Sequence, residues 1–389
     1  MHTLFLRSGK DRPVRQGHPW VFSGALRELD PSLPPGAIVR LCAADGVPLG
    51  VGYVNPRCTI AVRLLSRRDE PIDARFVAGR VAAAAALRRR VVGTDTDAYR
   101  LINGEGDGLP GVLVDRYADV LVVQLLTAGA DQLKPLLLQA LTDVLRPRAV
   151  VERSEGAVRA AEGLAPSSGV LVGALGEGEA VRENGLRFMV QPGAGQKTGH
   201  FCDQRDNRGR FRALAADARV LDAFAYSGGF AVHAGAGGAA RVVAVDSSGA
   251  AIAAAEHNWR LNQLPPERAT FVAADVGRYL RDSDETYDLL SLDPPALVKQ
   301  RKDVARGARA YKDLNLWAMR RARPGALLFT FTCSQHVDAV LFRKIVAGAA
   351  ADAGRAASVV AHLGPGPDHP VALGHPEGEY LHGLLLRVG

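Results

Sequence analysis

The stretch that decides the fold reads V-L-D-A-F-A-Y-S-G-G-F, from Val220 to Phe230. It is an apolar run that ends in an aspartate and continues through paired glycines into the next expected helix. From here onward, strands are expected at residues 220–223, 241–245, 270–273, 287–292, 326–331, 358–361 and 380–386, with helical patterns between them. This alternation predicts a mostly parallel, doubly wound α/β sheet. The last two strands have no room for a helix between them, so they should form an antiparallel pair at the edge of the sheet.

The residues before this sheet show two other patterns. Residues 1–72 contain short apolar runs separated by Pro and Gly turns, which predicts a small β-rich domain. Residues 73–180 combine expected helices at 76–92 and 131–145 with strands at 99–103, 111–117, 120–126 and 149–152, which predicts a compact α+β domain. A linker is expected at 173–183, before a last domain at 181–389. The run Arg88-Arg89-Arg90 is expected to be a solvated helix end, with RNA contact as the alternative.

The composition is typical of a globular protein, with 47% hydrophobic and 23% charged residues. The four cysteines include no C-x-x-C pair, which indicates a reducing compartment and argues against a zinc site or any other metal centre. No signal peptide or apolar stretch of membrane-spanning length is present, so a cytoplasmic protein without membrane contact is expected. The sequence leaves open whether the chain forms a homodimer.

The charge favours a polyanionic partner. The net charge is +7, and residues 1–75 carry eleven Lys/Arg against seven Asp/Glu, which is more than half of the excess. Arg7, Lys10, Arg12 and Arg15 precede Trp20, so phosphate contacts and an aromatic ring are both available for RNA. A lone aromatic among apolar residues usually packs inward, and this is the expectation for Trp20.

Carboxylates follow three successive strands of the expected sheet. Asp222 ends the first strand just before Gly228 and Gly229, Asp246 ends the second, and Asp275 follows the third. The carboxyl edge of such a sheet is the ligand crevice, where an acidic residue after the second strand accepts hydrogen bonds from ribose hydroxyls. A G-x-G-x-x-G fingerprint for NAD is missing, and a carboxylate beside the glycines suits a cationic amino group, so S-adenosylmethionine fits better. The alternative for each aspartate is helix N-capping.

The fourth and fifth strands end in the most specific chemical signals. The fourth runs into Asp293-Pro294-Pro295, where paired prolines fix one rigid loop that could present a carboxylate to a nucleobase amino group; alternatively, the prolines merely end the strand. The fifth ends in T-C-S with Cys333. A free cysteine usually packs in the core, but Cys333 lies at the functional edge beside Asp293. Attack of its thiolate on C6 of cytosine would make C5 nucleophilic enough to accept a methyl group.

These motifs resemble the RlmI-type family of bacterial 23S ribosomal RNA cytosine-5 methyltransferases over nearly the whole chain. The similarity rests on G-H-P-W-V-F-S-G (17–24), L-I-N-G-E-G-D-G-L-P-G-V-L-V-D-R-Y (101–117), G-Q-K-T-G-H-F-C-D-Q-R-D-N-R (195–208), F-A-Y-S-G-G-F (224–230), L-D-P-P-A (292–296), A-Y-K-D-L-N (310–315), T-C-S (332–334) and D-H-P-V (368–371). The resemblance implies a PUA domain, a central domain and a Rossmann-like class I methyltransferase domain with helices on both faces of a seven-stranded sheet.

The resemblance also implies the chemistry and its residues. The thiol matching Cys333 is the nucleophile, and the carboxylate matching Asp293 contacts the N3 and amino edge of cytosine. The cofactor is S-adenosylmethionine, and the residues expected near it are Asp222, Phe224, Tyr226, Ser227, Gly228, Gly229, Asp246, Ser247, Asp275, Val276, Gln204 and Arg205. The partner is 23S ribosomal RNA or a precursor particle, and the residues expected near it are Pro294, Pro295, Lys299, Lys197, Arg7, Lys10, Arg12 and Arg15.

Two other functions remain open at the level of sequence. One is methylation of a different base atom in ribosomal RNA, such as guanine N7, which would need no cysteine at position 333. The other is a non-catalytic RNA-binding protein of ribosome assembly, which would not bind S-adenosylmethionine. The group that removes the C5 proton is not assigned by any of these motifs.

Overall fold

The computed structural model describes residues 1–193 and 199–389, which fold as two compact units. Unit 1 comprises Met1–Val181, Val190–His200 and Pro367–Gly378. Unit 2 comprises Arg182–Met189, Phe201–Gly366 and Glu379–Gly389. The chain therefore passes from one unit to the other more than once.

The N-terminal part of unit 1 is a five-stranded sheet in the order β1-β3-β4-β5-β2. Its elements are β1 (His2–Phe5), α1 (Arg12–Arg15), β2 (Trp20–Phe22), β3 (Ile38–Cys42), β4 (Pro48–Val54) and β5 (Ile60–Ser66). β1 is parallel to β3, and the other neighbours are antiparallel. Val39, Leu41 and Val62 are fully buried in its core. The predicted β-rich N-terminal domain is confirmed.

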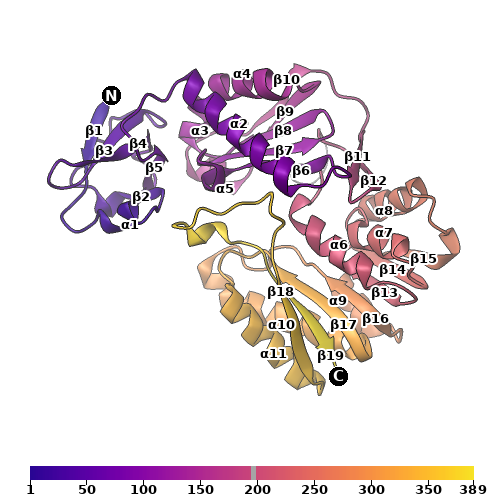
Figure 1. Cartoon of the computed structure of the whole chain (residues 1–389). Coiled ribbons are helices and arrows are strands. Elements are labelled where there is room, and N and C mark those ends of the chain that lie inside the picture. The colour runs from indigo at the N-terminus through magenta and orange to yellow at the C-terminus, as the bar shows by residue number, and fades with distance from the viewer. Residues whose placement is uncertain (194–198) are drawn as a thin grey trace. The chain divides into compact units, whose positions relative to one another are not determined.

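The second part of unit 1 is a five-stranded sheet packed against helices (Figure 1). Its elements are α2 (Ala74–Val91), β6 (Ala98–Asn103), β7 (Val112–Tyr117), β8 (Val120–Leu125), α3 (Ala128–Gln132), α4 (Lys134–Leu145), β9 (Ala149–Ser154), α5 (Ala157–Ala161) and β10 (Ser167–Gly173). Buried Val81 of α2, Val114 of β7 and Leu137 of α4 belong to one core. The sequence did not predict α5 and β10, because β10 is mostly exposed and lacks an apolar face.

The arginine run at the end of α2 is not uniformly solvated. Arg88 is 1% exposed, and its guanidinium donates to both carboxylate oxygens of Asp107 at 2.5 and 2.8 Å and to the backbone oxygen of Asp368 at 2.7 Å. Arg89 and Arg90 are exposed. The prediction of a solvated helix end, and its RNA-contact alternative, were therefore wrong for Arg88, because these acceptors replace its hydration inside the fold.

Residues 367–378 lie between two strands of unit 2 in the sequence but fold within unit 1. The backbone N–H of Arg100 donates to Asp368 Oδ2 at 2.9 Å, and Asn103 Nδ2 donates to the backbone oxygen of Pro370 at 3.0 Å. A Cβ atom at Gly106 would lie 1.8 Å from that same oxygen of Pro370. Only glycine therefore allows this close approach of the two backbones.

The predicted linker at 173–183 is irregular only in its first half. Its second half is β11 (Glu179–Glu183), which forms a two-stranded sheet with β12 (Leu186–Val190). Buried and more exposed side chains alternate along β12, and the backbone N–H of Met189 donates to Asn258 Oδ1 at 2.8 Å. The linker prediction missed this hairpin because residues 173–178 before it are rich in Gly, and its first strand, E-A-V-R-E, carries charged residues at three of five positions.

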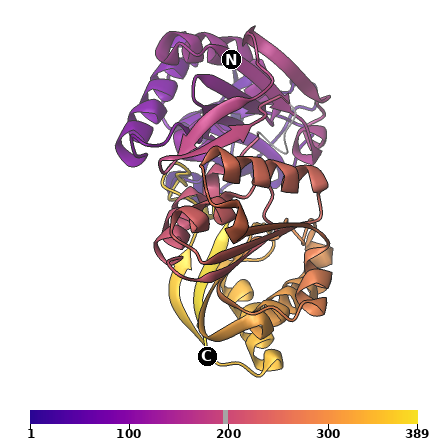
Figure 2. The ribbon, with the colours of Figure 1, turned by 90° about the vertical axis from the view of Figure 1, so that its right-hand side faces the viewer.

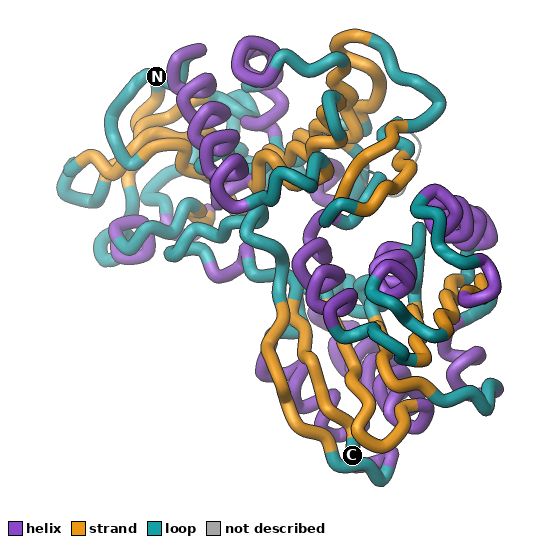
Figure 3. The backbone as a smooth tube through the Cα atoms, turned by 45° about the vertical axis from the view of Figure 1, so that its right-hand side comes forward, coloured by secondary structure: helices purple, strands orange, loops and turns teal. Residues whose placement is uncertain are grey.

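Unit 2 is built on a seven-stranded sheet in the order β15-β14-β13-β16-β17-β19-β18, with its strands side by side in Figure 3. The strands are β13 (Arg219–Ala223), β14 (Arg241–Asp246), β15 (Ala269–Ala273), β16 (Tyr287–Leu292), β17 (Ala322–Thr332), β18 (Ala357–Leu363) and β19 (His382–Val388). All are parallel to one another except β19, which is antiparallel to β17 and β18. Both the predicted parallel sheet and the antiparallel edge pair are confirmed.

Helices cover both faces of this sheet (Figure 1 and Figure 2). They are α6 (Arg205–Ala213), α7 (Gly229–Ala236), α8 (Gly249–Leu261), α9 (Val276–Asp282), α10 (Val304–Arg321) and α11 (Ala339–Ala353). Leu280 of α9, Tyr311 of α10 and Phe342 of α11 share one core. On the other face, the ring of Phe211 of α6 lies 5.1 Å from those of Phe230 of α7 and Phe329 of β17. Among the residues described, no helix is both long and apolar enough to cross a membrane.

Candidate active site

The turn between β13 and α7 holds an unusual backbone conformation. Phe224 and Tyr226 have φ angles of +64° and +47°, which L-residues other than glycine rarely adopt. Such conformations cost on the order of 1–3 kcal/mol each and persist where the surroundings impose them. Asn258 of α8 supplies one restraint by donating to the backbone oxygen of Ser227 at 3.0 Å. The turn therefore has one imposed shape, as expected of a binding loop at a sheet edge.

Asp222 supports this turn from inside the protein. Its side chain is 1% exposed and accepts hydrogen bonds from Ser291 Oγ at 2.7 Å and from the backbone N–H of Ala231 at 2.9 Å. Burial raises the pKa of Asp222 to about 6, against the opposing effect of these two donors. Asp222 thus ties β13, β16 and the first turn of α7 together at the carboxyl edge of the sheet.

The paired glycines allow close packing around the same turn. A Cβ atom at Gly228 would lie 2.8 Å from Ala255 Cβ of α8, and one at Gly229 would lie 2.8 Å from Arg208 Cδ. Gly228 also has a φ angle of +78°. A side chain at either position would come too close to neighbouring protein atoms, so the packing here favours glycine at both.

Asp246 lies at the end of β14 beside the turn. It is half-buried, and its carboxylate accepts from the backbone N–H of Tyr226 at 3.0 Å and from that of Ser248 at 2.9 Å. Ser247, which follows it, is exposed. An accessible carboxylate at this position matches the place expected for a ribose ligand.

The two residues expected after the third strand differ in position. Asp275 is exposed, and its side chain caps α9 by accepting from the backbone N–H of Arg278 at 2.7 Å, so the capping alternative is realised there. Val276 is 2% exposed, and its side chain packs in the core beside Leu280. Its side chain is therefore a packing group.

The segment before α6 is only partly described. Lys197 lies outside the described residues. Gln204, in the short helix η3 (Cys202–Gln204), is 2% exposed; its Oε1 accepts from Asn207 Nδ2 at 2.6 Å, and its buried Nε2 has no hydrogen-bond partner among the residues that the structure describes. Arg205 is also buried and contacts Asp206. A buried amide donor of this kind is expected to meet a ligand or water.

Asp293 and Cys333 leave neighbouring parallel strands at the same edge. Leu292, the last residue of β16, pairs with Thr330 of β17, and β17 ends two residues later, at Thr332. Asp293 therefore directly follows the first of these strands, and Cys333 directly follows the second. Asp293 and Cys333 are both half-buried. The sheet thus brings together the carboxylate and the thiol that the sequence indicated.

The loop after Asp293 combines buried and exposed residues. Pro294 is buried, whereas Pro295 and Lys299 are exposed. Val298 is 2% exposed and anchors the loop in the core. His336, the titratable residue closest to Cys333 in the sequence, is exposed.

The expected RNA-binding arginines and lysine lie on the N-terminal part of unit 1. Arg7, Lys10, Arg12 and Arg15 are all exposed; Arg7 Nε donates to the backbone oxygen of Leu26 at 2.9 Å, and Arg15 pairs with Asp11 at 2.5 Å. Trp20 is half-buried as expected of a packing aromatic, because its Nε1 donates to Glu105 at 2.7 Å and its ring packs 4.4 Å from that of His375.

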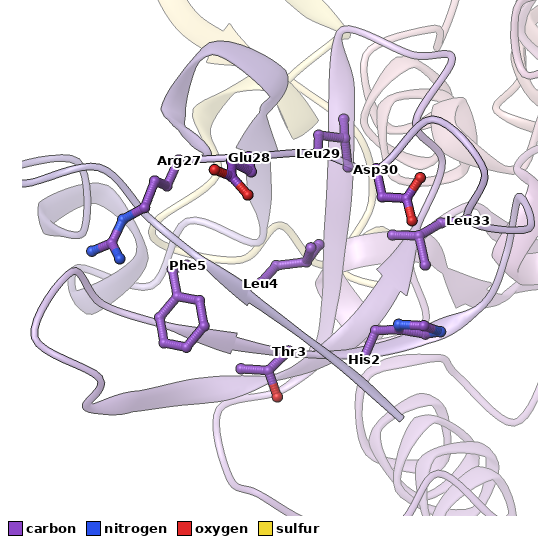
Figure 4. A pocket seen from close by; sticks show the side chains of 9 residues that line it. All are labelled: His2, Thr3, Leu4, Phe5, Arg27, Glu28, Leu29, Asp30 and Leu33. Atoms are coloured by element: carbon purple, nitrogen blue, oxygen red, sulfur yellow. The ribbon is translucent and has the colours of Figure 1, made fainter.

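A groove of about 630 Å³ lies along β1 in the same part of unit 1 (Figure 4). Phe5 and Arg27 lie toward one end, with the guanidinium 5.5 Å from the ring centroid, and His2 and Asp30 lie toward the other. Glu28 and Asp30 add two carboxylates to the lining. This groove contains none of the predicted site residues.

Comparison with known proteins assigns the family. Residues 4–67 match the model of a PUA-like domain, and residues 100–341 match that of the S-adenosylmethionine-dependent methyltransferases. Ribosomal RNA large subunit methyltransferase I of Alteromonas mediterranea is 40% identical over 99% of this chain and 98% of its own length. The protein of the same name from Erwinia tasmaniensis is 40% identical over 99% of both chains. The chain belongs to this methyltransferase family.

Solved structures share the family's fold. A SAM-dependent methyltransferase from Streptococcus mutans aligns over 100% of both chains with a TM-score of 0.86 and 22% identity. A methyltransferase structure complexed with SAH gives the same coverage, TM-score and identity. The predicted fold class, with a PUA-like domain and a Rossmann-like methyltransferase domain, is thereby confirmed.

The family membership makes this chain an enzyme with S-adenosylmethionine as its cofactor. The described residues fit that cofactor: the half-buried Asp246 carboxylate, the constrained turn before α7 and the buried Gln204 amide are polar groups at one end of unit 2. No group of three or more His, Cys, Asp or Glu side chains arranged to hold a metal occurs among the described residues.

Proposed function

We propose that this enzyme forms 5-methylcytosine in the RNA of the large ribosomal subunit through a covalent adduct with Cys333. The observation that carries the proposal is the placement of the half-buried Cys333 thiol directly after β17, beside the strand that Asp293 follows. The names of the curated relatives supply the class of substrate, ribosomal RNA of the large subunit. A methyltransferase acting on nitrogen needs no thiol at this edge, whereas C5 of cytosine requires activation.

The proposed reaction begins and ends with the Cys333 thiolate. The Cys333 thiolate adds to C6 of cytosine and forms a C–S bond, which makes C5 nucleophilic. C5 would then take the methyl group that S-adenosylmethionine supplies, with S-adenosylhomocysteine as the leaving group. A base removes the proton from C5, the double bond re-forms, and the C–S bond breaks to return the thiolate. Asp293 contacts the N3 and amino edge of the base, and a proton passed from its carboxyl group to N3 neutralises the negative charge that thiolate addition puts on the ring.

Cofactor binding is assigned to the turn and the strand ends around it. Asp246 accepts from the ribose hydroxyls, with Ser247 beside it. The turn residues Phe224, Tyr226, Ser227, Gly228 and Gly229 surround the amino-acid part of the cofactor, and Asp222 positions them. Asp275 faces the adenine, while Val276 contributes through its backbone only. Gln204 and Arg205 complete the pocket, and the buried Gln204 amide donates to the cofactor or RNA.

RNA binding is assigned to two surfaces. Pro294, Pro295 and Lys299 contact the target nucleotide, as does Lys197. The target cytosine must be single-stranded or flipped out of a helix before the thiol can reach C6. Arg7, Lys10, Arg12 and Arg15 bind phosphates of the RNA. A substrate in ribosomal RNA or its precursor particle places the activity in the cytoplasm.

The test uses the full chain with large-subunit RNA from cells that lack the gene. Wild type should transfer labelled methyl groups to a cytosine, identified by nucleoside mass spectrometry, and should form a stable adduct with RNA containing 5-fluorocytosine. Cys333→Ala should abolish both. Cys58→Ala is the matched control, because the Cys58 thiol is also half-buried but lies in unit 1.

Undiminished methylation by Cys333→Ala would contradict the proposal and favour transfer to another atom, such as guanine N7. Calorimetry with S-adenosylmethionine addresses the non-catalytic alternative separately. Failure of the wild-type chain to bind the cofactor would contradict any catalytic function.

A further inference from the structure

The hydroxyl of Ser334, next to Cys333, joins three segments of unit 2. Ser334 is 1% exposed, and its Oγ lies 2.9 Å from the Tyr311 hydroxyl of α10. The same Oγ accepts from the backbone N–H of Val298 at 3.1 Å. Ser334 thereby connects the segment after β17 both to α10 and to the loop that begins at Asp293.

Tyr311 forms the other half of this connection. Its side chain is fully buried, and its ring packs edge-on against Phe342 with centroids 6.0 Å apart. Burial raises the pKa of the phenol, against the lowering effect of its hydrogen bond to Ser334. The phenol is therefore neutral at physiological pH and keeps a proton to donate.

The residues on both sides of Cys333 are held toward the same helix, α10. Thr332 lies on the same face of β17 as Thr330, which bonds to Asn315 of α10, and Thr332 Oγ1 accepts from the backbone N–H of Ser334 at 3.3 Å. Successive side chains of an extended chain point to opposite faces. Holding Thr332 and Ser334 on the α10 side therefore favours the opposite side for the Cys333 thiol.

The Asp293 loop is fastened to α10 at the same place. A Cβ atom at Gly307 would lie 2.3 Å from Val298 Cγ2 and 2.9 Å from the backbone oxygen of Leu297, so the helix and loop are in close contact. One turn after Tyr311, Asn315 Nδ2 donates to the backbone oxygen of Tyr311 at 2.8 Å, and its Oδ1 accepts from Thr330 Oγ1 at 2.7 Å. This fixes the helix against β17.

We propose that Tyr311 and Ser334 are positioning residues that set the Cys333 thiol against the Asp293 loop for attack on the base. The proposal rests on the proposed function and adds to it two residues that touch neither the cofactor nor the reacting atoms. Small displacements of reacting groups can lower rates by about a hundredfold, which is why the buried hydrogen bonds from Ser334 to Tyr311 and to Val298 of the Asp293 loop matter.

The test compares variants that each lack one buried hydroxyl group in the core of unit 2. Tyr311→Phe and Ser334→Ala should each lower the single-turnover rate of adduct formation by about ten- to a hundredfold, with the KM for S-adenosylmethionine unchanged. Because both remove one shared hydrogen bond, the double variant should lose less than the product of the two single losses. Tyr287→Phe is the matched control: Tyr287 lies in the same core, and its hydroxyl is 2.9 Å from that of Tyr279.

A purely structural role predicts a different pattern. It would lower the melting temperature of Tyr311→Phe and Tyr287→Phe alike and leave the adduct rate of the folded enzyme within twofold of wild type, which would overturn the inference. Tyr311→Phe alone decides the matter if Ser334→Ala does not fold, because it retains the buried ring. If Cys333→Ala is inactive while both hydroxyl variants react normally, only the positioning role fails; if Cys333→Ala is active, the proposed function fails.

Discussion

Arg208 donates from Nε and Nη2 to the two carboxylate oxygens of Glu183, each at 2.6 Å, and both side chains are at least 96% buried. Arg208 also donates to the backbone oxygen of Phe201 at 2.7 Å, and its side chain lies over Gly229 at the start of α7. The ion pair therefore joins the β11–β12 hairpin and α6 to the helix that begins at the candidate cofactor turn.

Replacing Glu183 with Gln should destabilise the protein strongly. The change leaves the Arg208 charge buried without its counter-ion, which costs about 3–5 kcal/mol in comparable cases. Urea unfolding of the full chain measures the loss. Arg241→Ala is the control, because the pair Arg241–Glu285 is exposed and worth less than about 1 kcal/mol. Equal effects of the two variants would contradict the importance assigned to the buried pair.

The buried carboxyl of Asp222 should make stability depend on pH. Its pKa rises from 3.8 in the unfolded chain to about 6 in the fold, so the folded state binds more protons between these values. The contribution of Asp222 to the free energy of unfolding is fully present below pH 3.8 and is lost as pH rises through 6. The loss amounts to about 3 kcal/mol, at about 1.4 kcal/mol for each pKa unit.

The measurement compares wild type with Asp222→Asn at several pH values. The asparagine cannot ionise, and Ser291 can accept from its amide while its oxygen still accepts from Ala231. The stability of wild type relative to the variant should fall between pH 4 and 6. The variant is needed as a reference because burial lowers the pKa of His233 to about 4. Ionisation of His233 therefore makes stability rise with pH over the same range, opposite to the effect of Asp222. A constant difference across this range would contradict the prediction.

The sequence predicted the features that depend on local pattern. The strands of unit 2 follow from apolar periodicity, and parallel strands bring their carboxyl ends to one edge, so Asp246, Asp293 and Cys333 could be located together. Asp275 shows the limit of this reasoning, since an aspartate after a strand is also a good helix cap, and here its carboxylate caps α9.

The residues that the sequence did not assign act through tertiary packing. Tyr311 lies in the middle of a helix and comes beside Ser334 only when α10 packs on the sheet. Arg88 resembled a solvated charge because its acceptors, Asp107 and the backbone of Asp368, are 19 and 280 residues away. The quoted motifs A-Y-K-D-L-N and T-C-S contained Tyr311 and Ser334, but only the structure shows that they touch.

Gly307→Ala should lower the rate of methyl transfer strongly while the protein stays folded. The added methyl group meets the backbone of Leu297 and the side chain of Val298, so α10 or the Asp293 loop must shift. Methyl transfer should fall at least tenfold, by the sensitivity of rates to misplacement. Gly79→Ala in α2 is the control, because nothing lies within 4 Å of its Cβ position and alanine should add about 0.5–1 kcal/mol of stability. Full activity of Gly307→Ala would show that this contact does not position the loop.

The exposed cations Lys10 and Arg12 should contribute to RNA affinity through phosphates. Each phosphate contact releases counter-ions, so the logarithm of the binding constant falls linearly with the logarithm of salt concentration. Alanine at both positions should weaken binding of large-subunit RNA and reduce that slope by about one for each contact removed. Filter binding over a range of KCl concentrations measures the slope, and affinity for S-adenosylmethionine should stay unchanged.

Arg278→Ala provides the control for this last prediction, because Arg278 is equally a surface cation but lies on α9 of unit 2, where its side chain is 83% exposed and paired with Asp282. Its loss should leave the salt slope as in wild type. If removal of Arg278 lowered the slope as much as removal of Lys10 or Arg12, the RNA would be responding to total charge. A selective effect of Lys10 and Arg12 would instead locate the phosphate contacts on α1 and the turn before it, which is the surface that the charge distribution of the first 75 residues favours.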